Sequence, residues 1–230
     1  MGRCHPYSGL RRSPEPVNTG PGRAPPPPAA LPLAPKLALS LFVAVLVPVY
    51  WAHHGPAHFL WFSDVALLLA LVAIWRESRL IAGTAAVATL LPELGWNLDF
   101  FTRLIAGRDV LGFNGTAYMF DTGEPLYLRA LSLFHVFLPP LLLWLVWRLG
   151  YDRRALPAAV LLGWTVLIAS YLLTEPEKNV NWVHGLGDPP QSWLPPGLHL
   201  AALLLLYPLC ACLPAHLALR WACAGGRGRP

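Results

Sequence analysis

Residues 127–149 read YLRALSLFHVFLPPLLLWLVWRL, and this stretch decides the fold class. A helix that crosses the hydrocarbon core of a bilayer needs about 20 mostly apolar residues. The stretch is long enough, and its charged residues, Arg129 and Arg148, lie near its two ends. It therefore predicts a membrane-spanning helix with a single histidine, His135, in its outer half.

Five further apolar stretches flank this one, at residues 37–51, 59–75, 80–105, 155–174 and 193–221. Over the whole chain 55% of residues are hydrophobic and 13% are charged, whereas an average soluble domain has about 25% charged residues. This composition excludes an ordinary soluble enzyme and a wholly disordered chain. The sequence predicts an all-α, polytopic membrane bundle of about six helices over residues 36–222.

The ends of the chain differ from this body. Residues 1–35 are rich in proline and arginine and include the run Pro25–Pro28. Such a composition buries too little apolar surface to offset the entropy of ordering, so we expect a disordered tail. Residues 223–230 are expected to form a short basic end.

The net charge of +5 is explained by membrane topology. If the N-terminus is cytoplasmic, 13 of the 17 basic residues fall on the cytoplasmic side of a six-helix chain, as the positive-inside rule requires. We therefore expect both termini in the cytoplasm and a location in the plasma (inner) membrane. The expected partners are membrane lipids and not nucleic acid, while cofactor and oligomeric state are left open.

Polar residues gather in the half of the membrane opposite the termini. Asp64 and Glu93 lie inside predicted spans, and a charge there costs at least about 2.5–3.5 kcal/mol, so such residues are candidates for a functional site. Six of the eight histidines fall on the same side: His53, His54, His58, His135, His184 and His199. Packing residues scattered at random would not show this bias.

Helical spacing groups some of these side chains. Glu93 and Asn97 are four residues apart and share one helix face. Pro139 has no N–H for the carbonyl four residues earlier, so the carbonyl of His135 should be free to accept a bond from elsewhere. Asp99 and Arg103 have the spacing of an ion pair at the membrane interface.

These residues suggest an outward-facing polar pocket that binds or transforms a small amphiphile or lipid. In an enzyme, His135 or His184 would serve as general acid or base and Glu93 or Asp64 would orient it. The expected ligand-binding residues are Asn97, Asn179, Asn181 and His199. Two alternatives stay open, a haem or metal site using histidines such as His135 and His199, and a small-solute transporter.

The segment Asn179-Val180-Asn181-Trp182, followed by Pro189 and a further apolar stretch, resembles the N-x-N-aromatic signature of YwaF-like bacterial integral membrane proteins. In layout these resemble the six-helix androgen-induced intramembrane hydrolases, which use a threonine and a histidine on lipid esters. The resemblance covers roughly residues 175–210 and the six-helix plan. It implies that His135 occupies the place of the membrane-embedded histidine, and it matches no threonine of this chain to the nucleophile.

Overall fold

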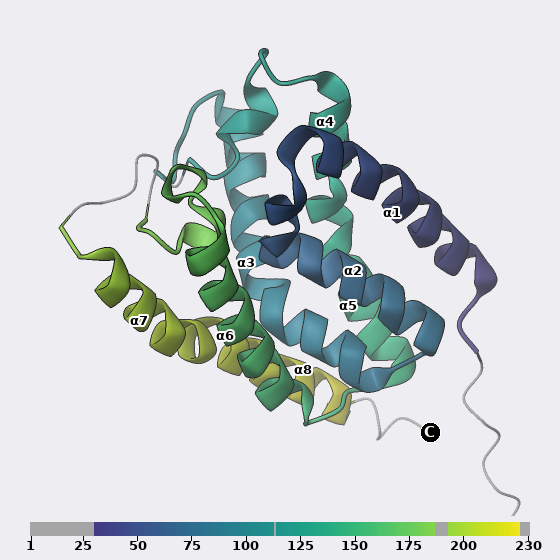
Figure 1. Ribbon diagram of the computed structural model, residues 1–230. Coiled ribbons are helices and arrows are strands. Elements are labelled where there is room, and N and C mark those ends of the chain that lie inside the picture. Colours follow the sequence, from purple (N-terminus) through teal and green to yellow (C-terminus); the bar gives the residue numbers. More distant parts are fainter. Residues whose placement is uncertain (1–29, 113, 187–192, 226–230) are drawn as a thin grey trace, which may run out of the picture.

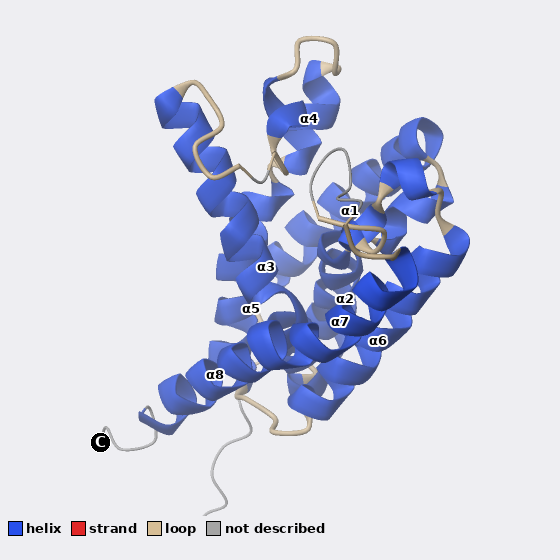
Figure 2. Ribbon diagram, turned by 90° about the vertical axis from the view of Figure 1, so that its left-hand side faces the viewer, coloured by secondary structure: helices blue, strands red, loops and turns tan. Residues whose placement is uncertain are grey.

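The computed structural model describes residues 30–112, 114–186 and 193–225, and this part of the chain is helical without a β-strand (Figures 1 and 2). The α-helices are α1 (Leu33–His54), α2 (Phe62–Arg76), α3 (Arg79–Ala106), α4 (Leu126–Ser132), α5 (Phe134–Leu149), α6 (Ala155–Leu173), α7 (Pro196–Tyr207) and α8 (Leu213–Gly225). Short 3-10 turns lie in the connections: η1 (Pro56–Leu60), η2 (Ala117–Phe120), η3 (Pro176–Lys178) and η4 (Val180–Trp182).

The all-α prediction is confirmed. Helices α4 and α5 are separated only at Leu133, and the π-helical turn η5 (Pro208–Cys212) joins α7 to α8. The helices thus follow the six predicted stretches. Within the described residues, four segments are long and apolar enough to cross a membrane: Leu33–His54, Leu126–Leu149, Ala155–Leu173 and Pro196–Cys223.

The remaining two stretches differ from these four for simple reasons. Helix α2 has 15 residues and is short for a span. Helix α3 has 28 residues but carries Glu93, Asp99 and Arg103, which lower its hydropathy. Length and composition therefore identify the other four segments as candidate spans, and they do not identify α2 and α3.

Helix α3 is the centre of the bundle and packs against α2, α5, α6 and α8 (Figure 1). Its first half is a run of small residues, AGTAAVAT at residues 82–89, and all of them are buried. A Cβ atom on Gly83 would lie 2.9 Å from the Cβ of Ala155, so the small residue is what lets α6 approach α3. Membrane helices commonly associate in this way.

The described part of the chain begins and ends at the same end of the bundle, which we call the terminal end. The start of α1 and the end of α8 lie there, together with the α2–α3 and α5–α6 turns (Figure 1). The connections α1–α2, α3–α4 and α6–α7 lie at the opposite end, which we call the loop end. The basic residues of the terminal end are Lys36, Arg76, Arg79, Arg148, Arg153, Arg154 and Arg220.

One expectation about helix limits is corrected. Helix α1 begins at Leu33, inside the predicted tail, because Lys36 pairs with Glu77 at 2.6 Å and fixes the first turn of α1 to the end of α2. Helix α5 continues through Pro139 and Pro140, and the predicted stretch is interrupted at Leu133. Residues 1–29 and 226–230, which make up most of the predicted tail and basic end, lie outside the described residues.

Candidate functional site

A buried acid–histidine pair joins α3 to α5. Glu93 Oε2 lies 2.9 Å from His135 Nδ1, and the two side chains are 4% and 12% exposed. The imidazole of His135 stacks on the indole of Trp96, with ring centroids 4.3 Å apart and planes at 12°. Both the orientation and one nitrogen of this histidine are therefore fixed, as an acid–base group requires.

Asn97 completes the arrangement from the same face of α3. Its Nδ2 donates to the carbonyl of His135 at 2.7 Å and to the carbonyl of Glu93 at 2.8 Å. The first of these is the carbonyl that Pro139 was predicted to leave free. Asn97 thus binds the backbone of His135, and Glu93 binds its imidazole ring.

Asp64, at the start of α2, is buried close to this pair. It is 3% exposed, its Oδ2 lies 4.0 Å from His58 Nε2, and its Oδ1 has no hydrogen-bond partner among the described residues. Buried polar atoms normally have partners, and an exception calls for an explanation. Asp64 therefore offers an acceptor that the described protein does not use.

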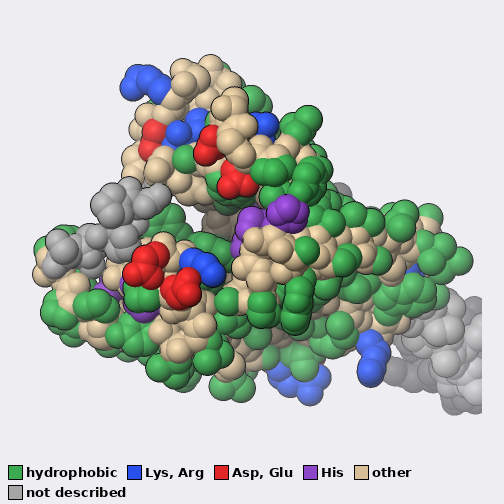
Figure 3. Space-filling model, turned by 45° about the horizontal axis from the view of Figure 1, so that its top comes forward, with side chains coloured by type: hydrophobic (Ala, Val, Ile, Leu, Met, Phe, Trp, Pro, Cys, Tyr) green, Lys and Arg blue, Asp and Glu red, His purple; other side chains and the backbone are tan. Residues whose placement is uncertain are grey.

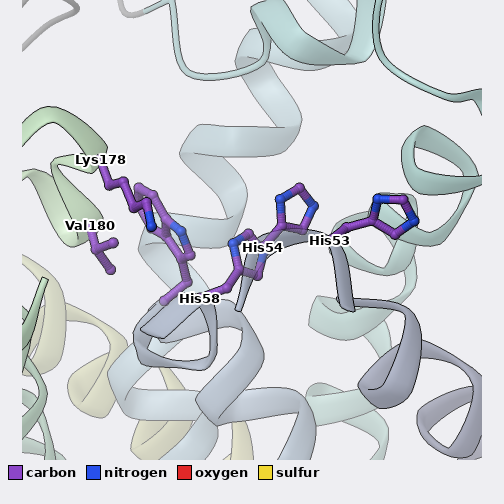
Figure 4. A pocket seen from close by; sticks show the side chains of 6 residues that line it. His53, His54, His58, Lys178 and Val180 are labelled. Carbon is purple, nitrogen blue, oxygen red and sulfur yellow. The ribbon is translucent and has the colours of Figure 1, made fainter. Parts of the chain in front are cut away.

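Three histidines connect this region to the surface at the loop end. A cavity of about 300 Å³ is lined by His53, His54, His58, Trp61, Lys178 and Val180. Figure 4 shows the three imidazoles following one another across the cavity, with Lys178 and Val180 approaching from the other side. Figure 3 shows histidine side chains beside a hollow at this end, with acidic and basic side chains around it.

The histidines of the cavity are in mutual contact. The rings of His54 and His58 stack with centroids 4.4 Å apart, although helix α1 ends at His54, before Gly55. Burial, together with smaller effects of the nearby His54, His135 and Lys178, lowers the pKa of His58 to about 3. His58 is therefore neutral at pH 7, and it lies near enough to His135 to link the cavity to the buried pair electrostatically.

A hydroxyl pair lies in the same region. The Tyr50 and Ser132 hydroxyls are 2.7 Å apart, and Ser132 also donates to the Leu128 carbonyl at 3.2 Å. Tyr50 packs edge-on against the rings of both His54 and His58. Among the described residues, the Ser132 hydroxyl is bonded to Tyr50 and Leu128 and has no bond to His135.

The remaining predicted residues form a separate group in the α6–α7 connection. Asn181 accepts a bond from the Phe62 amide at 3.0 Å and donates to Leu60 O and Ser170 Oγ at 2.7 and 2.9 Å. These bonds use both N–H groups of the Asn181 amide. Asn181 therefore fastens this loop to the start of α2.

Asn179, His184 and His199 also serve this loop. Asn179 bonds within the loop, to Gly185 O at 2.7 Å and to the His184 amide at 2.9 Å. His199 Nε2 lies 2.8 Å from Trp182 O. The imidazole of His184 stacks on Tyr171, and burial lowers the pKa of His184.

The structure therefore separates the eight predicted site residues into two groups. Asp64, Glu93, Asn97 and His135 lie together, and Asn179, Asn181, His184 and His199 organise the loop. The sequence also predicts that the loop at residues 179–188 caps the pocket, and its last two residues lie outside the described residues. Sequence reasoning did not select Tyr50 or His58 as site residues. Both lie near Gly55-Pro56, where a helix is expected to end, and this position could have indicated that they face the same connection.

The predicted Asp99–Arg103 pair is wrong. Asp99 Oδ2 instead accepts bonds from the Thr116 amide and hydroxyl at 2.9 and 2.7 Å, and Arg103 pairs with Asp109 at 3.2 Å. The long α3–α4 connection folds back over the end of α3 and supplies partners that are more distant in sequence. Helical spacing alone cannot foresee such contacts.

The chemistry available at the pair is that of a positioned acid and base. Among the described residues, no group of three or more histidine, cysteine, aspartate or glutamate side chains is placed to hold a metal ion. His135 and His199, the residues considered for haem, each already have a polar partner within the protein.

Comparison with protein-family models, with curated proteins and with solved structures finds no match to this chain.

Proposed function

We propose that this chain is a six-span integral membrane protein of the plasma (inner) membrane, with both termini in the cytoplasm, that binds a small amphiphile from the outer side and acts on it by acid–base chemistry. The observation that carries the proposal is the Glu93–His135 pair, buried inside an apolar bundle beside a histidine-lined cavity. A buried carboxylate–imidazole pair in a membrane is costly, and it is seldom kept without a function.

The topology rests on the distribution of charge and on the two ends of the bundle. Seven basic residues of the described chain lie at the terminal end, and Arg103, Arg108, Arg129 and Lys178 lie at the loop end. Cytoplasmic loops collect lysine and arginine. The terminal end is therefore the cytoplasmic end in this proposal, and the histidine-lined cavity opens to the outside.

The roles of the residues follow from their contacts. Glu93 accepts from Nδ1–H of His135, which leaves Nε2 as the nitrogen that takes or gives a proton. Asp64 Oδ1 supplies the acceptor for a ligand hydroxyl or a water. Because Ser132 is bonded to Tyr50, the attacking group in this proposal is a water activated by His135, and the favoured reaction class is hydrolysis of an ester in an amphiphile.

The test is lipid turnover by the purified protein in nanodiscs. Mixed ester lipids and monoacyl esters are supplied, and released fatty acid is measured by mass spectrometry. We expect release by the parent and a loss of about 100-fold or more in H135A and E93Q, because removing a general acid–base group costs about that much. The control is H216A, which removes a histidine bonded to Tyr151 at the terminal end.

The proposal distinguishes binding from chemistry. If the parent releases no fatty acid but retains a fluorescent monoacyl amphiphile, and E93Q and H135A lose that retention, the site binds without hydrolysis. If both variants behave like H216A in both measurements, the pair has a structural role only.

A further inference from the structure

A second cavity lies at the opposite end of the molecule. It measures about 810 Å³, within the range of ligand pockets. It lies between the start of α3, the α5–α6 turn and the last turns of α8, and its lining residues are Arg79, Tyr151, Asp152, Arg153, Leu217, Arg220, Trp221 and Cys223. None of these residues takes part in the site at the loop end.

The charge of this cavity is strongly positive. Arg79, Arg153 and Arg220 line it, and within the described chain none of the three has a carboxylate within ion-pair distance. The carboxylate of Asp152 is taken by Arg154, with Nη2–Oδ2 at 2.8 Å and Nε–Oδ1 at 3.2 Å. Those bonds, with a further contribution from Arg79, hold the pKa of Asp152 below its usual value.

Tyr151, which lines the cavity, is held in place by a hydrogen bond. The Tyr151 hydroxyl lies 2.6 Å from His216 Nδ1. Burial raises the pKa of Tyr151 to about 12, although Arg220 lowers it, so the phenol stays protonated and adds no negative charge. The cavity thus combines three guanidinium groups with a neutral phenol.

Apolar side chains form the wall on one side. Leu217 and Trp221 lie on α8, and they are 52% and 83% exposed. Exposed tryptophan near a helix end is typical of the headgroup depth of a bilayer. A ligand that fits this cavity has an anionic head for the arginines and a chain for the apolar wall.

We propose that this cavity at the terminal end binds the phosphate headgroup of an anionic phospholipid, with Arg79, Arg153 and Arg220 around the phosphate and Leu217 and Trp221 beside an acyl chain. Guanidinium groups form bidentate bonds with phosphate oxygens, and basic pockets between membrane helices on the cytoplasmic side favour acidic lipids. The proposal rests on the membrane placement of the bundle but not on chemistry at Glu93 and His135.

The experiment measures lipid binding to the detergent-purified protein by native mass spectrometry. The probes are dioleoyl phosphatidylglycerol, dioleoyl phosphatidylcholine, and inorganic phosphate as a competitor. The variant R153Q/R220Q removes two cavity charges. The control R76Q/R148Q removes two exposed charges from the same end, neither of which lines the cavity.

We expect the parent to prefer phosphatidylglycerol over phosphatidylcholine. R153Q/R220Q should bind phosphatidylglycerol at least about tenfold more weakly, and R76Q/R148Q should keep the parent's affinity. Where the double variant does not fold, R220Q alone, at the exposed end of α8, makes the same comparison.

Three results would overturn the proposal. Equal affinity for the two lipids would remove the selectivity for a negative headgroup. An equal loss in both double variants would show general charge attraction. Full displacement by millimolar inorganic phosphate would show a site for a free anion. None of these outcomes depends on fatty-acid release, so the failure of this proposal and that of hydrolysis are distinguishable.

Discussion

The Asn97–His135 contact gives a quantitative test of how α3 and α5 hold the site. In N97A, the carbonyl of His135 loses its donor, and Pro139 supplies no replacement N–H. Hydrogen bonds between membrane helices contribute about 0.6 kcal/mol on average and up to about 1.7, while an unsatisfied buried carbonyl costs about 1–3 kcal/mol. The bond to Glu93 O contributes little, because that carbonyl also accepts from a backbone amide of α3.

We therefore expect N97A to lower the free energy of unfolding by about 2 kcal/mol. In a P139A background, residue 139 regains an N–H for the carbonyl of His135, so the same substitution should cost about 1 kcal/mol less. The P140A background is the control, because its new N–H faces the carbonyl of Val136. The assay is unfolding by sodium dodecyl sulfate in mixed micelles, followed by circular dichroism. An equal cost of N97A in the P139A and P140A backgrounds would refute the reasoning.

Three further predictions concern other contacts. G163A should destabilise the bundle by about 1–3 kcal/mol, because its Cβ would overlap the ring of Tyr207, whereas G95A, with open space around it, should not; thermal unfolding compares the two. N181A should raise amide exchange in residues 174–186, measured by mass spectrometry, since three bonds of the loop are lost; unchanged protection would contradict its role as a fastener. The pKa of His58 lies below its value in the unfolded chain, so acid favours unfolding. Its contribution to stability is therefore present above about pH 6.5 and lost as pH falls toward 3, and H58Q should flatten that decline in a pH series of unfolding curves.

Much of the fold could be predicted because a membrane helix appears in the sequence as a long run of mostly apolar residues. The stretch at residues 127–149 and its five counterparts correspond to the observed helices. The junction at Leu133 and the π-helical turn that begins at Pro208 were not foreseen, although Pro208 supplies no N–H to its helix and is a local signal for an irregular turn. The α3 helix shows the limit of composition, because the helix at the centre of the bundle is less apolar than α2, α5 and α6, which pack against it.

The site was predictable where helix geometry alone decides the contact. Four-residue spacing put Glu93 and Asn97 on one face, and the missing N–H of Pro139 left the carbonyl of His135 for a partner. The same reasoning could not predict the contacts that the loops make. The partners of Asp99 and Asn181 come from 17 and up to 121 residues away, and no local pattern encodes such pairings.

The central claim is that an amphiphile binds beside Glu93 and His135, and the most direct test of it is to map which residues the ligand contacts. A monoacylglycerol with a diazirine in its chain and an alkyne tag is supplied to the protein in nanodiscs, and labelled peptides are mapped by mass spectrometry after illumination. The account predicts labelling in residues 50–64, 93–100 and 131–136, with a clear loss of that labelling in E93Q and H135A. Labelling spread evenly over the lipid-facing helices, and equal in the parent and both variants, would contradict it.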